Sequence, residues 1–145
     1  MNIWQRNLTI AVLYGLLTGC GLHTIQEDEV EGELAGEILQ DKVTMNGEKI
    51  LCDQPLYLEC FNITKEQCYS EITPSIKQSC VKYVRSKTGK LNNQSSIQTF
   101  ARSVMGCLYG KHLILMHYKQ REEIEKCMNN IPQLDGDQIL KSLWQ

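Results

Sequence analysis

From Thr64 onward, apolar residues recur every three or four positions, the spacing of one face of an α-helix. A first helix is predicted over residues 64–87, kinked or split at Pro74. A second is predicted from residue 95 to Gly106–Gly110, and a third over residues 111–128. A last short helix follows Asp137. The pattern predicts a mainly α protein, a small bundle of three main helices and a short C-terminal one.

A different pattern precedes these helices. Residues 43–50 place Asn46-Gly47 between two short segments with apolar ends. Both turn residues tolerate positive φ, which makes this dipeptide a strong hairpin signal. The sequence therefore predicts a short β-hairpin, which would need to pack against the helices because a lone two-stranded ribbon is marginally stable.

The segment before the hairpin is acidic. Between residues 21 and 50 there are eight Asp and Glu residues and two Lys residues. Its early part has too few large apolar side chains to offset the entropy lost on ordering. We interpret residues 20–40 as an acidic tether, with a binding role for the acidic run as the alternative. Residues 41–145 then form a single Cys-rich helical domain.

The first 19 residues are typical of a signal peptide, with Arg6 ahead of an apolar run over residues 8–17. That run is about half of the roughly 20 residues that span a bilayer as a helix. The following residues, Leu17-Thr18-Gly19-Cys20, resemble the lipobox of bacterial lipoproteins. The resemblance implies cleavage between Gly19 and Cys20 and acylation of Cys20, whose acyl chains would anchor the protein in a membrane. An ordinary secretory leader is the alternative.

In the lipoprotein family, an Asp directly after the lipidated Cys often signals retention in the inner membrane. Here that residue is Gly21. The resemblance therefore implies a location in the bacterial cell envelope, at the outer membrane and facing the periplasm, if the host has two membranes.

The chain has seven Cys, an odd number that the lipobox explains. Setting Cys20 aside leaves six in an exported domain, which predicts three disulfides. No Cys-x-x-Cys pair exists, which disfavours zinc ribbons and thioredoxin-like chemistry. Six Cys allow 15 pairings. Three helices packed up-down-up favour the pairs Cys68–Cys107, Cys80–Cys127 and Cys52–Cys60.

The net charge of −2 hides an uneven distribution. Between Glu71 and Glu122 there are nine Lys and Arg residues and no acid. This stretch predicts a basic face that binds an acidic exported protein or anionic lipid head groups, with a solvated helical surface as the alternative. The candidate partner-binding residues are Lys77, Lys82, Arg85, Lys87 and Arg102.

The sequence shows no recognisable catalytic motif, so we expect neither an enzyme nor a cofactor. His112 and His117 are five residues apart on the predicted third helix, whereas a metal-binding pair on one helix face is four apart. They are interpreted as ordinary histidines, and no metal site is predicted. The export signal and the missing recognition motif also disfavour nucleic acid.

Together these features predict an exported, lipid-anchored, non-enzymatic binding module, with Tyr83 or Tyr109 as an aromatic anchor for its partner. Its architecture is similar, at that level only, to immunity proteins that neutralise toxins delivered to the periplasm and to pilotin-like chaperones. A structural or lipid-binding component of the envelope is the alternative. An enzyme without a readable motif is a third class.

Overall fold

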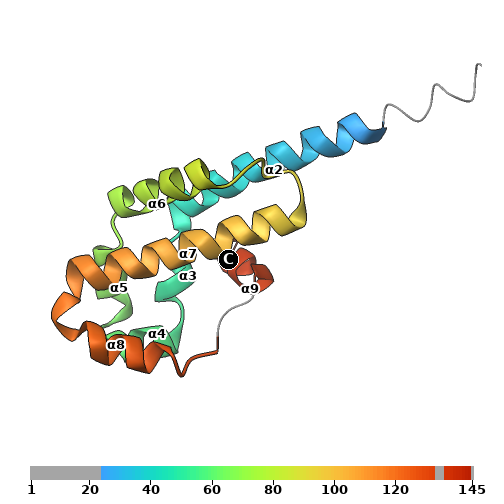
Figure 1. Cartoon of the computed structure of the whole chain (residues 1–145). Helices are drawn as coiled ribbons and strands as arrows, with labels where there is room; N and C mark the ends of the chain where they lie inside the picture. The colour runs from blue at the N-terminus through green and yellow to red at the C-terminus, as the bar shows by residue number, and fades with distance from the viewer. Residues whose placement is uncertain (1–23, 133–135, 145) are drawn as a thin grey trace, which may run out of the picture.

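The computed structural model describes residues 24–132 and 136–144, and every regular element within those two ranges is helical (Figure 1). The elements are α2 (Thr24–Asn46), α3 (Lys49–Cys52), α4 (Pro55–Phe61), α5 (Lys65–Glu71), α6 (Pro74–Lys87), α7 (Gln94–Met116), the 3-10 turn η1 (Tyr118–Gln120), α8 (Arg121–Met128) and α9 (Gly136–Trp144). The prediction of a mainly α fold is confirmed for these residues.

Helix α7 lies at the centre of the fold and contacts α6, α9 and α3 (Figure 1). Its residues Phe100, Val104 and Leu108 are fully buried. Helix α9 covers one side of this stripe with Ile139 and Leu143. Helix α2 packs against α6 and α9, while α4 and α8 pack together at the other end of the molecule. The core is therefore a continuous cluster to which almost every helix contributes.

The predicted β-hairpin over residues 43–50 is not formed, because this segment contains the end of α2, a turn and α3. Val43 lies one helical turn after Leu39, and both side chains are buried. The Gly47 N–H closes the turn by donating to the Val43 carbonyl oxygen at 2.8 Å. No glycine in the described residues has a positive φ, so the hairpin geometry that Asn46-Gly47 permits is not used. Burial of one helical face outweighs the local turn preference.

The predicted tether over residues 20–40 is helical from Thr24 onward, and the packed body includes at least its last turns. Gly36 is buried against Leu91, and Leu39 lies in the core. A long helix can pack along one face with only one small or apolar residue per turn. The acidic composition of this segment therefore did not indicate that it forms a helix. The predicted signal peptide, residues 1–19, lies outside the described residues.

The predicted split at Pro74 is confirmed, because α5 ends at Glu71 and Pro74 occupies the first turn of α6.

The predicted end of the second helix at Gly106–Gly110 is wrong. Helix α7 continues through both glycines to Met116, since a helical glycine costs only about 1 kcal/mol and the buried stripe continues beyond them. Residues 111–128 are consequently not one helix, and the chain turns between α7 and α8.

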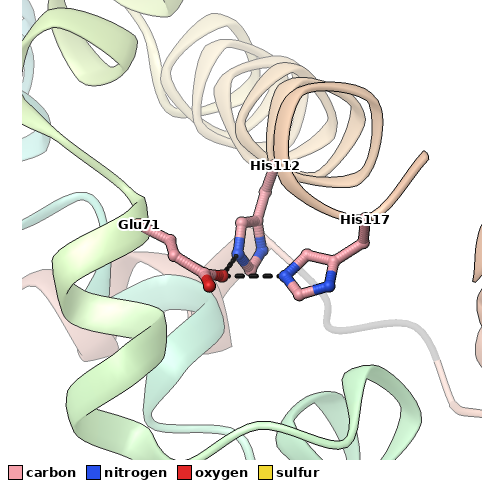
Figure 2. Close-up of side chains that lie close together, drawn as sticks. All are labelled: Glu71, His112 and His117. Carbon is pink, nitrogen blue, oxygen red and sulfur yellow. Dashed lines mark hydrogen bonds and ion pairs between the residues drawn. The ribbon is translucent and has the colours of Figure 1, made fainter. Parts of the chain in front are cut away.

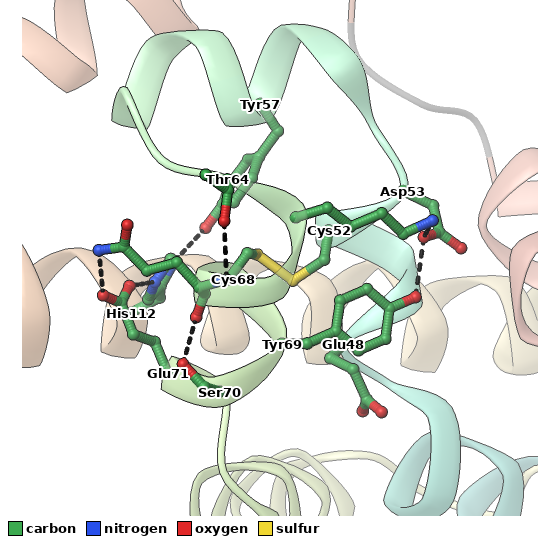
Figure 3. The surroundings of a disulfide bond; sticks show 12 residues. Glu48, Cys52, Asp53, Tyr57, Thr64, Cys68, Tyr69, Ser70, Glu71 and His112 are labelled. Carbon is green, nitrogen blue, oxygen red and sulfur yellow. Dashed lines mark hydrogen bonds and ion pairs between the residues drawn. A yellow bond between two sulfur atoms is a disulfide. The ribbon is translucent and has the colours of Figure 1, made fainter.

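Three disulfides join the helices, but none has the predicted partners. Cys52–Cys68 links α3 to α5 (Figure 3), Cys60–Cys127 links α4 to α8, and Cys80–Cys107 links α6 to α7. The predicted pairs assumed that residues 111–128 run alongside α6. The turn after Met116 instead sends α8 back along α4, and the break before Pro74 frees α5 to pack against α3.

Around the Cys52–Cys68 bond, the short helices are also joined by polar contacts (Figure 3). The Tyr69 hydroxyl donates to Asp53 Oδ1 at 2.8 Å, and Lys65 Nζ lies 2.6 Å from the same oxygen. Partial burial alone would raise the pKa of Asp53, but the hydrogen bonds from Lys65 and Tyr69 outweigh it and hold that pKa below its ordinary value. The disulfide and these polar contacts to Asp53 thus hold α5 against the segment that follows α3.

Among the described helices, none combines the length and the apolar character that crossing a membrane requires.

Candidate functional site

Two histidines and a glutamate converge at the end of the molecule where α5 and α7 finish (Figure 2). His112 Nε2 lies 2.6 Å from Glu71 Oε2, and His117 Nε2 lies 2.8 Å from the same oxygen. The two rings meet at a distance of 4.9 Å between centroids, almost perpendicular to each other. One carboxylate oxygen is therefore shared by two imidazole nitrogens.

The end of α7 brings the two histidines together. In a continuous helix, residues five apart point about 140° away from each other. Here α7 ends at Met116, and His117 adopts φ −125° and ψ 23° while its N–H donates to the Leu113 carbonyl oxygen. His117 therefore turns back toward the side chain of His112.

Glu71 reaches this point because α5 stops just before Pro74. Ile72, the next residue after Glu71, leaves the helical conformation and is buried. Its burial fixes the last turn of α5 against the core and aims the Glu71 side chain at the end of α7 (Figure 2).

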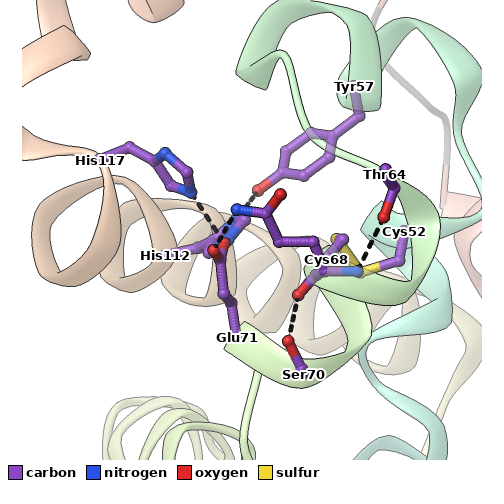
Figure 4. A network of polar contacts seen from close by, with 9 residues as sticks. Cys52, Tyr57, Thr64, Cys68, Ser70, Glu71, His112 and His117 are labelled. Atoms are coloured by element: carbon purple, nitrogen blue, oxygen red, sulfur yellow. Dashed lines mark hydrogen bonds and ion pairs between the residues drawn. A yellow bond between two sulfur atoms is a disulfide. The ribbon is translucent and has the colours of Figure 1, made fainter.

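A second layer of hydrogen bonds orients the cluster (Figure 4). The Tyr57 hydroxyl lies 2.7 Å from His112 Nδ1, and Gln67 Nε2 donates to Glu71 Oε1 at 2.8 Å. Burial raises the pKa of Tyr57, so the phenol keeps its proton and donates it to His112 Nδ1. His112 then carries its own proton on Nε2 and donates it to Glu71.

Burial also sets the charges of the cluster. It lowers the pKa of His112, and the neighbouring Glu71 only partly opposes this effect. Burial by itself would raise the pKa of Glu71, but hydrogen bonds from His117, His112 and Gln67 outweigh it and leave that pKa below its ordinary value. At neutral pH the site therefore holds a carboxylate beside a neutral His112 imidazole.

An aromatic wall closes one side of the cluster. Phe61 stacks on the His112 ring at 4.8 Å and an interplanar angle of 8°, and it meets His117 edge-on at 5.2 Å. Tyr57 stacks in turn on Phe61 at 4.4 Å. The side chain of His112 is 0% exposed, that of His117 9% and that of Glu71 17%. The site opens to solvent only on the side of Glu71 and His117.

Sequence reasoning missed this cluster because it assumed one helix over residues 111–128. Two signals could have revealed the turn. Four consecutive large apolar residues, Leu113 to Met116, are more than one buried helix face can cover, and four polar or amphipathic residues follow them. Nothing in the spacing connects Glu71 to either histidine, since the contact depends on how α5 packs against α7.

The structure does not unite the five predicted partner-binding residues on one surface. Lys77 is 5% exposed and forms an ion pair with Glu48 at 2.5 Å. Arg85 donates to the Gly89 carbonyl oxygen at 2.6 Å and so completes the end of α6.

The other three of these residues, Lys82, Lys87 and Arg102, are exposed, and none forms a side-chain ion pair or hydrogen bond with another described residue. Of the two candidate aromatic anchors, Tyr83 is 59% exposed. Tyr109 packs edge-on against Tyr57 and Phe61 and is half-buried. Only Tyr83 is therefore available to a partner.

Gly19 and Cys20 lie outside the described residues, and lipidation of Cys20 stays a prediction. Comparison of the chain with protein-family models, with curated proteins and with solved structures gave no significant match.

Proposed function

We propose that this chain is an exported, lipid-anchored, non-enzymatic binding protein that holds a rigid helical domain at the surface of a bacterial membrane. The observation that carries the binding role is an exposed tyrosine between two exposed lysines on a helix fixed by a disulfide. We call Lys82, Tyr83 and Lys87 the α6 surface.

The cysteines support export. All six that lie in the described residues are paired, and they link elements up to 67 residues apart in the chain. Such bonds persist in oxidising compartments and are rare in reducing ones. Together with the lipobox-like Leu17-Thr18-Gly19-Cys20, they favour a domain that folds after export and stays attached to the membrane through Cys20.

The α6 surface supports binding to an acidic partner. Tyr83 and Lys87 are four residues apart and share one face of α6. The Cys80–Cys107 bond holds this helix against α7, so α6 loses little conformational entropy when a partner binds. An exposed tyrosine supplies a large contact area, and flanking cations steer an acidic protein toward it. A toxin-neutralising role, in which this surface covers an acidic cleft of a toxin, uses these properties.

Charge reversal tests this role. The variant Lys82→Glu/Lys87→Glu, with or without Tyr83→Ala, is expected to bind an exported toxin encoded beside this gene at least tenfold more weakly than the parent, and to lose protection of cells against it. Tenfold corresponds to about 1.4 kcal/mol of binding free energy. Isothermal titration calorimetry and a survival assay measure the two effects.

Lys126→Glu is the matched control, because Lys126 is an exposed lysine on α8. It is expected to bind and protect like the parent. The toxin-neutralising role is contradicted if the parent protein binds none of the exported proteins encoded beside this gene and protects cells against none of them.

A second candidate is a structural, lipid-binding or pilotin-like component of the envelope. Two observations favour it: Lys82, Lys87 and Arg102 are all exposed, and α2 has an exposed apolar stripe formed by Leu34, Ile38 and Met45. In this case the same Lys82→Glu/Lys87→Glu variant should lose sedimentation with anionic vesicles. Unchanged vesicle binding would exclude a head-group role for the α6 surface.

A further inference from the structure

The donor atoms of the Glu71–His112–His117 cluster have the chemistry of metal ligands. One carboxylate oxygen and one ring nitrogen from each histidine all lie within 4.8 Å of one another. Imidazole and carboxylate together favour first-row divalent transition metals such as Zn²⁺ over Mg²⁺ or Ca²⁺, which prefer oxygen ligands alone. All the described cysteines are in disulfides, so no thiolate of the described residues competes for the ion.

All three separations between the donor atoms must change before the cluster can hold an ion. In a tetrahedral zinc site with bonds of about 2.0 Å, the ligand atoms are about 3.3 Å apart. Glu71 Oε2 now lies 2.6 Å from His112 Nε2 and 2.8 Å from His117 Nε2. The two ring nitrogens lie within 4.8 Å of each other and must approach to about 3.3 Å, so the His117 ring has to move toward His112 while the Glu71 carboxylate moves away from both rings. Glu71 is the most exposed of the three side chains and comes from the short helix α5, so it can make this shift.

We propose that Glu71, His112 and His117 form a binding site for a divalent transition-metal ion, with Zn²⁺ as its representative. Three protein ligands leave the fourth position of a tetrahedral ion open on the solvent side, where Glu71 and His117 are partly exposed. A water molecule or a side chain of a partner takes that position. The proposal is independent of the toxin-neutralising role.

The surroundings of the cluster are those of a metal site. Metal-binding histidines usually have a hydrogen-bond partner on their second ring nitrogen, which fixes the ring orientation. Tyr57 takes this place at His112 Nδ1, and Gln67 holds the free oxygen of Glu71. Phe61 covers the His112 ring and excludes water from that side.

Binding rearranges the hydrogens of the cluster. In the metal-free protein both Nε2–H groups donate to Glu71, and each Nε2 must lose its hydrogen before it can bind an ion. At His112 that hydrogen moves to Nδ1. The Nδ1–H of His112 then donates to the Tyr57 oxygen, and the direction of that hydrogen bond reverses. The metal replaces the two hydrogen bonds that Glu71 accepts.

The experiment titrates the full-length chain, with its disulfides intact, with Zn²⁺ by calorimetry and with Co²⁺ by visible absorption. We expect one ion per chain, a visible spectrum typical of tetrahedral Co²⁺, and a rise in the midpoint of thermal unfolding with Zn²⁺ that Mg²⁺ does not cause. Absence of one-to-one binding in the parent would overturn the proposal.

The variants Glu71→Gln and His117→Gln identify the ligands. Each is expected to weaken Zn²⁺ affinity at least tenfold and to abolish the tetrahedral Co²⁺ spectrum. Both replacements keep the size and polarity of the side chain at partly exposed positions, so the fold should survive and circular dichroism can confirm it. His112→Ala is a poorer choice because it opens a cavity beside Phe61.

The sequence offers matched controls. His23→Gln removes the third histidine of the chain, and Glu66→Gln removes an exposed carboxylate from the same short helix as Glu71. Both are expected to bind Zn²⁺ like the parent. If His23→Gln abolishes binding, or if Glu71→Gln and His117→Gln leave it unchanged, the ion binds elsewhere and the proposed site is wrong.

Discussion

Lys77 shows at the scale of one residue how this protein accommodates a charge in its interior. Its Nζ group lies 2.5 Å from Glu48 Oε2 and donates to the Met45 carbonyl oxygen at 2.8 Å. Met45 is in the last turn of α2, where carbonyl groups lack helical partners and attract a cation. The side chain therefore ties α6 to the turn between α2 and α3, which is why it is unavailable to a binding partner.

Replacing Lys77 by Ala should be strongly destabilising, because Glu48 would keep a largely buried charge without a partner. Breaking a buried ion pair in this way costs about 3–5 kcal/mol. The double variant Lys77→Met/Glu48→Leu removes both charges and should be much closer to the parent. Urea denaturation of the two variants measures the difference; equal losses in both would show that packing, and not charge, dominates at this position.

His117 shows how one backbone conformation creates a site. Its φ and ψ end α7 and turn the imidazole toward Glu71 and His112. The residue types of the cluster are visible in the sequence, but the spacing of five misleads if the helix is assumed to continue. The end of α7 is stabilised by a tertiary contact with α5. The spacing of apolar residues within α7 therefore does not indicate where that helix ends.

At the scale of the element, two helical glycines differ in how closely their surroundings pack against them. A Cβ atom at Gly36 of α2 would lie 2.6 Å from Leu91 Cβ and 2.9 Å from the Leu91 carbonyl oxygen. At Gly106 of α7, a Cβ atom would meet nothing within 4 Å apart from its own helix and chain neighbours. Gly36 is thus required for the close approach of α2 to the loop before α7, whereas Gly106 only weakens its own helix.

Alanine at these two positions should therefore shift stability in opposite directions. Gly106→Ala is expected to raise the free energy of unfolding by about 0.5–1 kcal/mol, the difference in helix propensity. Gly36→Ala gains the same propensity but overpacks against Leu91, which costs about 1–3 kcal/mol, so a net loss is expected. Thermal or urea unfolding of both variants tests this. If Gly36→Ala were as stabilising as Gly106→Ala, α2 would not be docked at Leu91.

At the scale of the whole molecule, the three disulfides close loops of very different length. Their sequence separations are 67 residues for Cys60–Cys127, 27 for Cys80–Cys107 and 16 for Cys52–Cys68. A cross-link that closes a longer loop removes more entropy from the unfolded chain. The Cys60–Cys127 bond joins α4 to α8 and so holds together the end of the molecule that contains the His–Glu cluster.

Removing the longest cross-link should therefore destabilise most. The chain-entropy model assigns about 4.4 kcal/mol to Cys60–Cys127, about 3.6 to Cys80–Cys107 and about 3.1 to Cys52–Cys68. Urea unfolding of the three paired Cys→Ala variants should follow this order. Peptide mapping of the unreduced parent checks the pairing itself, and a Cys68–Cys107 fragment would contradict the fold.

The helical class, the break at Pro74 and the pairing of all six described cysteines in some combination could be predicted from the sequence. These features follow from local periodicity, steric restriction and the even cysteine count. The packing of the helices sets which cysteines pair, buries Lys77, and brings Glu71 to His112 and His117. Each of these contacts depends on the direction in which one helix returns against another. Residues between 16 and 67 positions apart become neighbours only once the core has packed.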